Sequence, residues 1–265
     1  FDHLMAVYAA TVHRMDQAIG DLVNGLKDRG VLENTHILFR SAHGGTADSG
    51  PNARTDGDPT QAASNWFCGE SWAFLENAPF RKYKHYNHEG GIATPLIAHW
   101  PARGGVNPSF HGNRTGNFSR KAQGGPLCHT PAHLIDIMAT CVDVAGASYP
   151  TEVNGKPILP MEGKSLKNVF LGDSLESRHL FWEHEGNAAV RHGDLKLVRT
   201  GRNGPWELYD LKADRTEQHD LATAQPEKVK ELAAEWQRWA ERAHVIPYPG
   251  EGKAKKKGKG KKKAE

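Results

Sequence analysis

Residues able to hold an anion gather in one segment, PFRKYKHYNHEGGIATP, at positions 79–95. Lys84, His85 and His88 lie within it, shortly before the pair Gly90-Gly91. A lysine ammonium binds anionic groups as a point charge, and glycines allow the backbone to approach a ligand closely. The segment therefore suits a site for an anionic ligand, although the same residues equally suit a solvated basic surface loop.

A second polar group, Ser41-Ala42-His43-Gly44-Gly45, directly follows the apolar run HILFR at 36–40. We expect this run to be a strand, and open α/β sheets place their ligands where strands end. The stretch that continues to residue 70 is rich in Gly, Asp and Asn and is long for a loop in a compact domain. Such loops are either functional or disordered. His43 is thus either a metal ligand or a hydrogen-bonding residue of this loop.

The elements that must position these loops follow from apolar periodicity. Residues 3–29 carry apolar side chains every three or four positions, which predicts one long amphipathic helix. Because the strand at 36–40 follows this helix after only a short turn, we interpret the helix and the strand as part of a parallel α/β sheet. A second strand is expected at 95–100, and residues 131–144 predict a further helix.

The last third of the chain has the pattern of a smaller, separate layer. Short apolar runs divided by Gly- or Asp-bearing turns predict an antiparallel meander. The expected strands are 179–183, 188–191, 195–199 and 206–209. Residues 226–243 predict a closing helix, with Pro226 in its first turn and Trp236 and Trp239 on its apolar face.

These patterns divide the chain into three expected regions. Residues 1–170 form the larger α/β part, and residues 171–250 form the small antiparallel sheet with its helix. Residues 251–265 form a Lys-rich tail whose composition predicts disorder.

Composition and charge limit the class of protein. With 265 residues, 38% hydrophobic and 25% charged, the chain has the composition of a soluble globular protein. No apolar run approaches the ~18 residues that a membrane-spanning helix needs. The formal net charge is +3, but the tail holds eight Lys and two Glu, so residues 1–250 carry a net charge of −3. The body therefore offers no electrostatic support for binding nucleic acid, and composition says nothing of the oligomeric state.

The run NAPFRKYKHYNHEGGIATPLIAHWPA resembles the sulfatase family, more narrowly its bacterial arylsulfatase type. The resemblance extends over roughly residues 5–250 through YAATVHRMDQAIGDLVNGLKDRGVLENTHILF, HLIDIMATCVDVAGASYP, AVRHGDLKLV and WELYDLKADRTEQHDLA. It implies an alkaline-phosphatase-like α/β sandwich with a smaller C-terminal antiparallel sheet. It also implies a calcium-dependent hydrolase of sulfuric esters, on small molecules or polysaccharides, in the periplasm or secreted.

The resemblance assigns roles to single residues. Lys84, five residues before Glu89, matches the family lysine that binds the sulfate ester, and His85 and His88 lie beside that pocket. The family has Asp-Asn-Gly where this chain has Ala42-His43-Gly44, and both the Asp and the Asn bind calcium. Ala42 has no oxygen to offer, so one carboxylate ligand is missing. An imidazole at His43 shifts the preference toward Mn²⁺ or Zn²⁺, as in phosphodiesterase-like relatives that read Asp-His-Gly.

The family nucleophile is a formylglycine made in a Cys-x-Pro/Ala-x-Arg motif. None of Cys68, Cys128 and Cys141 lies in such a motif, and we interpret them as small packing residues. The sequence begins at Phe1, so we expect an N-terminally truncated chain that lacks the nucleophile and is inactive alone. Two alternatives remain open. One is a phosphate or phosphonate ester hydrolase of the same superfamily; the other is a degenerate, non-catalytic homologue that binds sulfated ligands.

Overall fold

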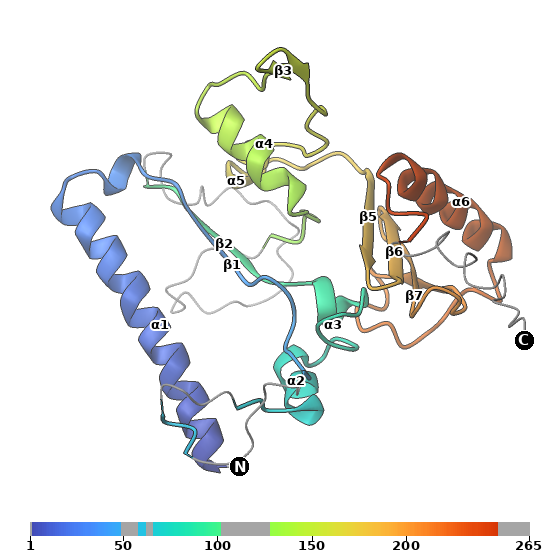
Figure 1. The fold of residues 1–265 in the computed structure, drawn as a ribbon, viewed down its shortest axis with the longest axis horizontal. Coiled ribbons are helices and arrows are strands. Elements are labelled where there is room, and N and C mark those ends of the chain that lie inside the picture. Colours follow the sequence, from blue (N-terminus) through green and yellow to red (C-terminus); the bar gives the residue numbers. More distant parts are fainter. Residues whose placement is uncertain (1, 49–57, 62–65, 102–127, 249–265) are drawn as a thin grey trace, which may run out of the picture. The chain divides into compact units, whose positions relative to one another are not determined.

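The structure, a computed structural model, describes residues 2–48, 58–61, 66–101 and 128–248 (Figure 1). The chain divides into two compact units, each discontinuous in sequence. The first unit comprises residues 1–41, 58–64 and 95–177; the second comprises 42–57, 65–94 and 178–265. The polar segments at 41–48 and 79–91 thus belong mainly with the C-terminal sheet. The boundaries at residues 170 and 250 stay a prediction, and the Lys-rich tail lies outside the described residues.

The first unit is a mixed α/β assembly. Its elements are α1 (Asp2–Asp28), the 3₁₀ turn η1 (Leu32–Asn34), β1 (Ile37–Arg40), β2 (Leu96–His99), α4 (Ile135–Val144), β3 (Glu152–Val153), β4 (Lys156–Pro157) and α5 (Lys167–Phe170). The long predicted helix is confirmed as α1, but none of its residues is buried, and much of its apolar stripe is exposed. Helix α4 begins at Ile135 and not at Pro131, because the His133 N–H donates to Asp136 Oδ2 (2.8 Å) and leaves the preceding residues outside the helix.

The interpretation of the first strands as part of a parallel sheet is wrong. Strands β1 and β2 pair antiparallel, with Ile37 opposite His99 and Arg40 opposite Leu96. The connection leaves β1 and enters β2 at the same end of the pair, so the strands run in opposite directions. The intervening chain is mostly part of the second unit, which is why a local pattern of helix and strand did not predict the direction.

The second unit is built on the predicted meander, which is confirmed. Its strands β5 (His179–His184), β6 (Asn187–His192), β7 (Leu195–Arg199) and β8 (Glu207–Asp210) pair antiparallel in the order β5-β6-β7-β8. Its helices are α2 (Glu70–Asn77), α3 (Glu89–Ile92) and the closing helix α6 (Pro226–Arg242), which confirms the helix expected at 226–243 (Figure 1). The strands and α6 form one layered support for the loops of this unit.

The two faces of the meander carry different residues. On one face Val190, Leu197 and Leu208 are fully buried and pack against Leu232 and Trp236 of α6. The alternation of side chains along each strand places another set on the opposite face. That set includes Val198 and Tyr209, both buried, and the charged residues Lys196 and Glu207. One face therefore packs against α6. The charged residues on the other face, Lys196 and Glu207, can form ion pairs with other segments of the same unit.

In the part of the chain that the structure describes, no helix is both long enough and apolar enough to cross a bilayer.

Candidate functional site

The two polar segments singled out in the sequence lie against each other in the second unit. The Gly44 N–H donates to the Gly91 carbonyl (3.1 Å), and the Lys84 N–H donates to the Gly45 carbonyl (3.0 Å). The Asn77 side chain joins them further: its Oδ1 accepts from the Gly45 N–H (2.9 Å), and its Nδ2 donates to the Lys82 carbonyl (3.2 Å). These bonds fix the backbone on which Lys84 is carried.

Glycines make this close approach possible. A Cβ added at Gly44 would lie 1.8 Å from the Gly90 carbonyl oxygen, and one added at Gly91 would lie 1.9 Å from the Tyr86 carbonyl oxygen. Both obstacles are backbone atoms that no side-chain rotation can move. The glycine pairs in both segments are therefore needed for packing of loop against loop.

We expect Gly44→Ala to destabilise the protein by about 1–3 kcal/mol, because the added methyl group forces the two segments apart. Gly20→Ala is the matched control, since a Cβ at Gly20 in α1 meets nothing within 4 Å and alanine favours a helix. Urea denaturation of both variants checks the expectation. Equal unfolding midpoints for Gly44→Ala and the wild type would contradict the close packing.

Lys84 forms an ion pair at the surface of this assembly. Its Nζ lies 2.5 Å from Asp48 Oδ2, and the other carboxylate oxygen of Asp48 lies 3.0 Å from His85 Nε2. The side chains of Lys84 and Asp48 are 28% and 35% exposed, so both can be reached from solvent. The hydrogen bond from Lys84 is the main cause that lowers the pKa of Asp48 to about 2; burial opposes it, and hydrogen bonds with His85 and Thr46 add to it. Asp48 is thus ionised at neutral pH, and its carboxylate holds the Lys84 ammonium at a fixed place.

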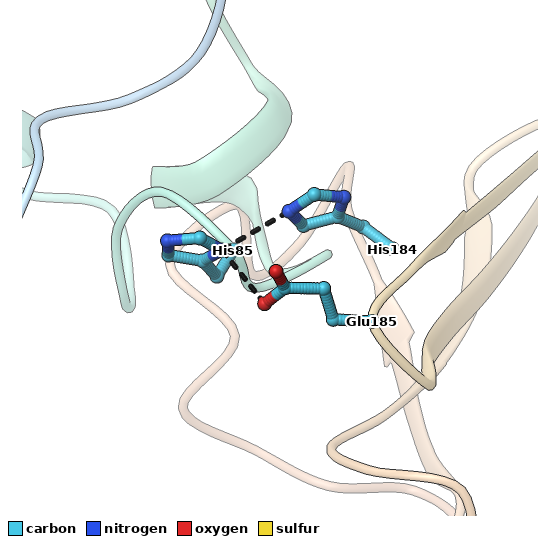
Figure 2. A group of neighbouring side chains, drawn as sticks. All are labelled: His85, His184 and Glu185. Atoms are coloured by element: carbon cyan, nitrogen blue, oxygen red, sulfur yellow. Dashed lines mark hydrogen bonds and ion pairs between the residues drawn. The ribbon is translucent and has the colours of Figure 1, made fainter.

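His85 lies beside this pair and contacts the turn between β5 and β6 as well. Its Nδ1 is 2.9 Å from Glu185 Oε2 and 3.0 Å from His184 Nε2, and the planes of the two imidazole rings are inclined by 19° (Figure 2). The Asn187 amide donates to the His85 carbonyl at 2.8 Å. His85 has a φ of +81°, a conformation that an L residue adopts only when its surroundings impose it.

His88, in contrast, points into the unit. It is fully buried, and its Nε2 lies 3.3 Å from Glu207 Oε2. The same Glu207 oxygen accepts a hydrogen bond from Arg81 Nη1 (2.7 Å), and Arg81 also contacts Tyr209 Oη (2.6 Å). Burial alone would raise the pKa of Glu207, but hydrogen bonds from His88, Tyr209 and Arg81 outweigh it and lower that pKa to about 2. The structure thus places His88 among the residues that attach the loop to β8.

A second buried charge network holds the segment by Glu89. The ammonium of Lys196, fully buried on β7, lies 2.9 Å from Glu89 Oε1 and 2.8 Å from Glu217 Oε1. Arg215 Nε contacts the other Glu89 oxygen at 2.7 Å, and the Glu89 N–H donates to Glu217 Oε2 at 2.8 Å. The three partners of Glu89 were not singled out from the sequence. The one available signal was a lysine inside the apolar strand LKLVR.

Residues 42 and 43, at the position of the family calcium ligands, are exposed and offer few atoms that could bind a metal ion. Ala42 has no side-chain donor atom, and His43 Nδ1 donates to the carbonyl of the next residue, Gly44, at 2.7 Å. His43 is not part of the one group of three potential metal ligands that the described residues bring together. A hard cation prefers several oxygen ligands. The residues at 42 and 43 therefore do not fit a calcium ion, and a calcium requirement stays a prediction from the resemblance alone.

The cysteines are unpaired thiols. Cys68 is half-buried, and burial raises the pKa of its thiol. Cys128 and Cys141 are exposed, so their interpretation as packing residues is wrong in the chain as described. Cys141 follows the buried Thr140 of α4 and therefore faces a different direction on the helix.

Comparison with known proteins identifies the family. The family model described as Sulfatase matches residues 2–147. An uncharacterized sulfatase of Schizosaccharomyces pombe is 28% identical over 267 residues, which cover 92% of this chain and 45% of that protein. The crystal structure of Ps i-CgsB in complex with k-i-k-neocarrahexaose shares the fold with a TM-score of 0.61 and 21% identity, over 88% of this chain and 42% of that one.

The structure of BT4656 in complex with its substrate D-glucosamine-2-N,6-O-disulfate also shares the fold, with a TM-score of 0.51 and 21% identity. That match covers 91% of this chain and 41% of BT4656. The chain thus spans less than half the length of each of these three relatives. Since the family model covers more than half of the chain, the chain belongs to the sulfatase family.

Proposed function

We propose that this chain carries the sulfate-binding part of a sulfatase that hydrolyses sulfate esters on saccharides. The observation that carries the proposal is the fixed ammonium of Lys84, paired with Asp48 at 2.5 Å and still 28% exposed. The sulfated ligand named for BT4656 and the oligosaccharide named for Ps i-CgsB support a saccharide as the alcohol part of the ester.

In this proposal Lys84 exchanges one anion for another. A sulfate ester carries a negative charge on its peripheral oxygens, and it would take the place of the Asp48 carboxylate at the Lys84 ammonium. Hydrolysis breaks the bond between sulfur and the alcohol oxygen, and the ammonium would stabilise negative charge on the oxygens bound to sulfur. Because backbone hydrogen bonds and buried ion pairs hold the loop in advance, little reorganisation is needed when the ester binds.

The proposal gives other residues supporting tasks. Asp48 keeps Lys84 and His85 in place while the site is empty, since each of its two oxygens contacts one of them. Glu89 attaches the loop to the sheet through Lys196, and His88 attaches it through Glu207. The proposal gives no described residue the role of nucleophile.

The test is an assay of sulfate release with the protein expressed from its complete reading frame. Glucosamine 6-sulfate, a carrageenan oligosaccharide and 4-nitrophenyl sulfate are the sulfate esters, and phenyl methylphosphonate is the competing phosphonate ester. We expect free sulfate from at least one sulfated saccharide, with kcat/KM about 100-fold or more above that for the phosphonate.

Two results would contradict the proposal, and each points to an alternative. Faster turnover of the phosphonate would indicate a phosphonate hydrolase of the same fold. No turnover of any ester, together with retained binding of a sulfated saccharide, would indicate a non-catalytic homologue.

A further inference from the structure

Three potential metal ligands converge at the edge of the second unit. His85 Nδ1 lies 2.9 Å from Glu185 Oε2 and 3.0 Å from His184 Nε2. One ligand atom from each of the three residues lies within 4.8 Å of the others. Figure 2 shows the side chains of His184 and Glu185 directed at the ring of His85. The two segments are 99 residues apart in sequence, so this convergence is a product of the fold.

Hydrogen bonds alone cannot satisfy the nitrogen and oxygen atoms of all three side chains. A proton on His85 Nδ1 can form a good hydrogen bond to one of its two neighbours and only a shared, bent one to the other. Without that proton, the Glu185 carboxylate faces a ring lone pair, and the two repel each other. A cation at the centre would instead accept a lone pair from all three groups at once.

The other ring nitrogen of His85 is already arranged as in a metal site. His85 Nε2 lies 3.0 Å from Asp48 Oδ1, and Asp48 is ionised because Lys84 holds its second oxygen. A carboxylate that accepts the Nε2 proton fixes the tautomer in which Nδ1 carries the free lone pair. Metal-binding histidines are commonly oriented by such a carboxylate.

The backbone on both sides is held in place. His184 pairs with Asn187 at the end of the β5–β6 hairpin, and the Gly186 N–H donates to Glu183 Oε1 at 2.7 Å. The Asn187 amide reaches across to the His85 carbonyl at 2.8 Å. The ligands are therefore positioned by the sheet and by the Lys84 loop, and they do not depend on a chance meeting of surface side chains.

From these contacts we propose that His85, His184 and Glu185 bind one Zn²⁺ ion, at a place separate from the Ala42-His43 position. Two imidazoles and one carboxylate are a donor set that zinc accepts, with a fourth position open to water or ligand. Ca²⁺ and Mg²⁺ prefer all-oxygen sites. Tetrahedral zinc separates its ligand atoms by about 3.3 Å, so His184 Nε2 and Glu185 Oε2 must each move a few tenths of an ångström away from His85 Nδ1. Their own separation, which is within 4.8 Å, must reach the same value. The ion would tie the Lys84 loop to the β5–β6 hairpin.

The test is calorimetric titration of ZnCl₂ into chelator-treated protein expressed from its complete reading frame, with Co²⁺ absorption as a second readout. We expect one zinc equivalent that Glu185→Gln and His184→Ala weaken by about 10-fold or more, and Co²⁺ bands typical of four-coordination that both variants lose. Asp48→Asn, which removes only the supporting carboxylate, is expected to weaken zinc by about 10-fold.

Two controls locate the ion. His179→Gln removes another histidine of the same sheet, which stacks on His192 at 4.1 Å, and His43→Ala removes the imidazole at the family metal position. Both are expected to keep the zinc affinity of the wild type. Glu185 is 63% exposed, so Glu185→Gln is expected to fold, and circular dichroism checks this. Wild-type affinity in Glu185→Gln and His184→Ala, no zinc bound by the wild type, or loss of zinc in His43→Ala would each overturn the proposal.

Discussion

Replacing Lys196 by methionine is expected to lower the free energy of unfolding by about 3–5 kcal/mol, the usual cost of removing one partner from a buried ion pair. The Lys196 side chain is fully buried and lies between Glu89 and Glu217, at 2.9 and 2.8 Å. Methionine would fill the same space but would leave two carboxylates close together with only Arg215, on one side of Glu89, to compensate them. One of these carboxylates would then have to take up a proton.

The pH dependence of stability distinguishes this explanation from simple loss of packing. Burial would raise the pKa of Glu89, but the charges of Lys196 and Arg215 outweigh it and lower that pKa from its ordinary 4.5 to about 2. A carboxyl with a lowered folded pKa contributes stability above its unfolded pKa, and this contribution is lost as the pH falls toward 2. In Lys196→Met we expect that acid-dependent loss below pH 4.5 to shrink, because Glu89 no longer resists protonation.

Guanidinium denaturation at pH 7 and at pH 3 measures both effects. Lys228→Met is the control, because Lys228 pairs with Glu231 on the exposed side of α6, where ion pairs contribute little. If Lys196→Met is no less stable than Lys228→Met at pH 7, the network does not hold the loop.

Replacing Lys84 by alanine is expected to lower kcat/KM for a sulfate ester by about 10²–10³-fold, the usual cost of removing one donor from a developing anion. The protein should remain nearly as stable as the wild type, since the pair of Lys84 with Asp48 is partly exposed and such pairs contribute little. Lys84→Arg is expected to restore only part of the activity, because a planar guanidinium does not replace a point charge.

Lys82→Ala is the matched control for Lys84. It removes the same charge from the same loop, but the Lys82 ammonium lies over the Tyr86 ring at 4.8 Å, whereas the Lys84 ammonium binds Asp48. Steady-state kinetics with one sulfate ester, measured on both variants, decides the point. Equal activity of the two variants would remove Lys84 from the site and would leave the loop with a structural role.

Local patterns predicted the parts of the fold that local physics determines. The four-stranded meander and helix α6 appear where alternation and the 3.6-residue period place them. These signals are strong because each strand and helix has one apolar face that must be buried. The direction of β2 relative to β1 has no such signal, because it depends on the path of the chain between Arg40 and Leu96.

The supports of the site were not predictable in the same way. Lys84 and the glycine pairs are recognisable because they follow each other closely in sequence. Lys196, Glu207 and Glu217, in contrast, are charged residues on strands and turns, and in a sequence such residues predict contact with solvent. The burial of Lys196 and Glu217 and the partial burial of Glu207 become apparent only when segments more than 100 residues apart are brought together.

This separation has a consequence for how the protein is made. Glu89 precedes Lys196 by 107 residues, and ribosomes add about 5–20 residues per second. For roughly 5–20 seconds of synthesis, the Lys84 loop exists without the strands that hold it. A nascent chain interrupted before β7 would carry the anion-binding lysine but not its support, so the ability to bind an anion would arise only when the C-terminal sheet is complete.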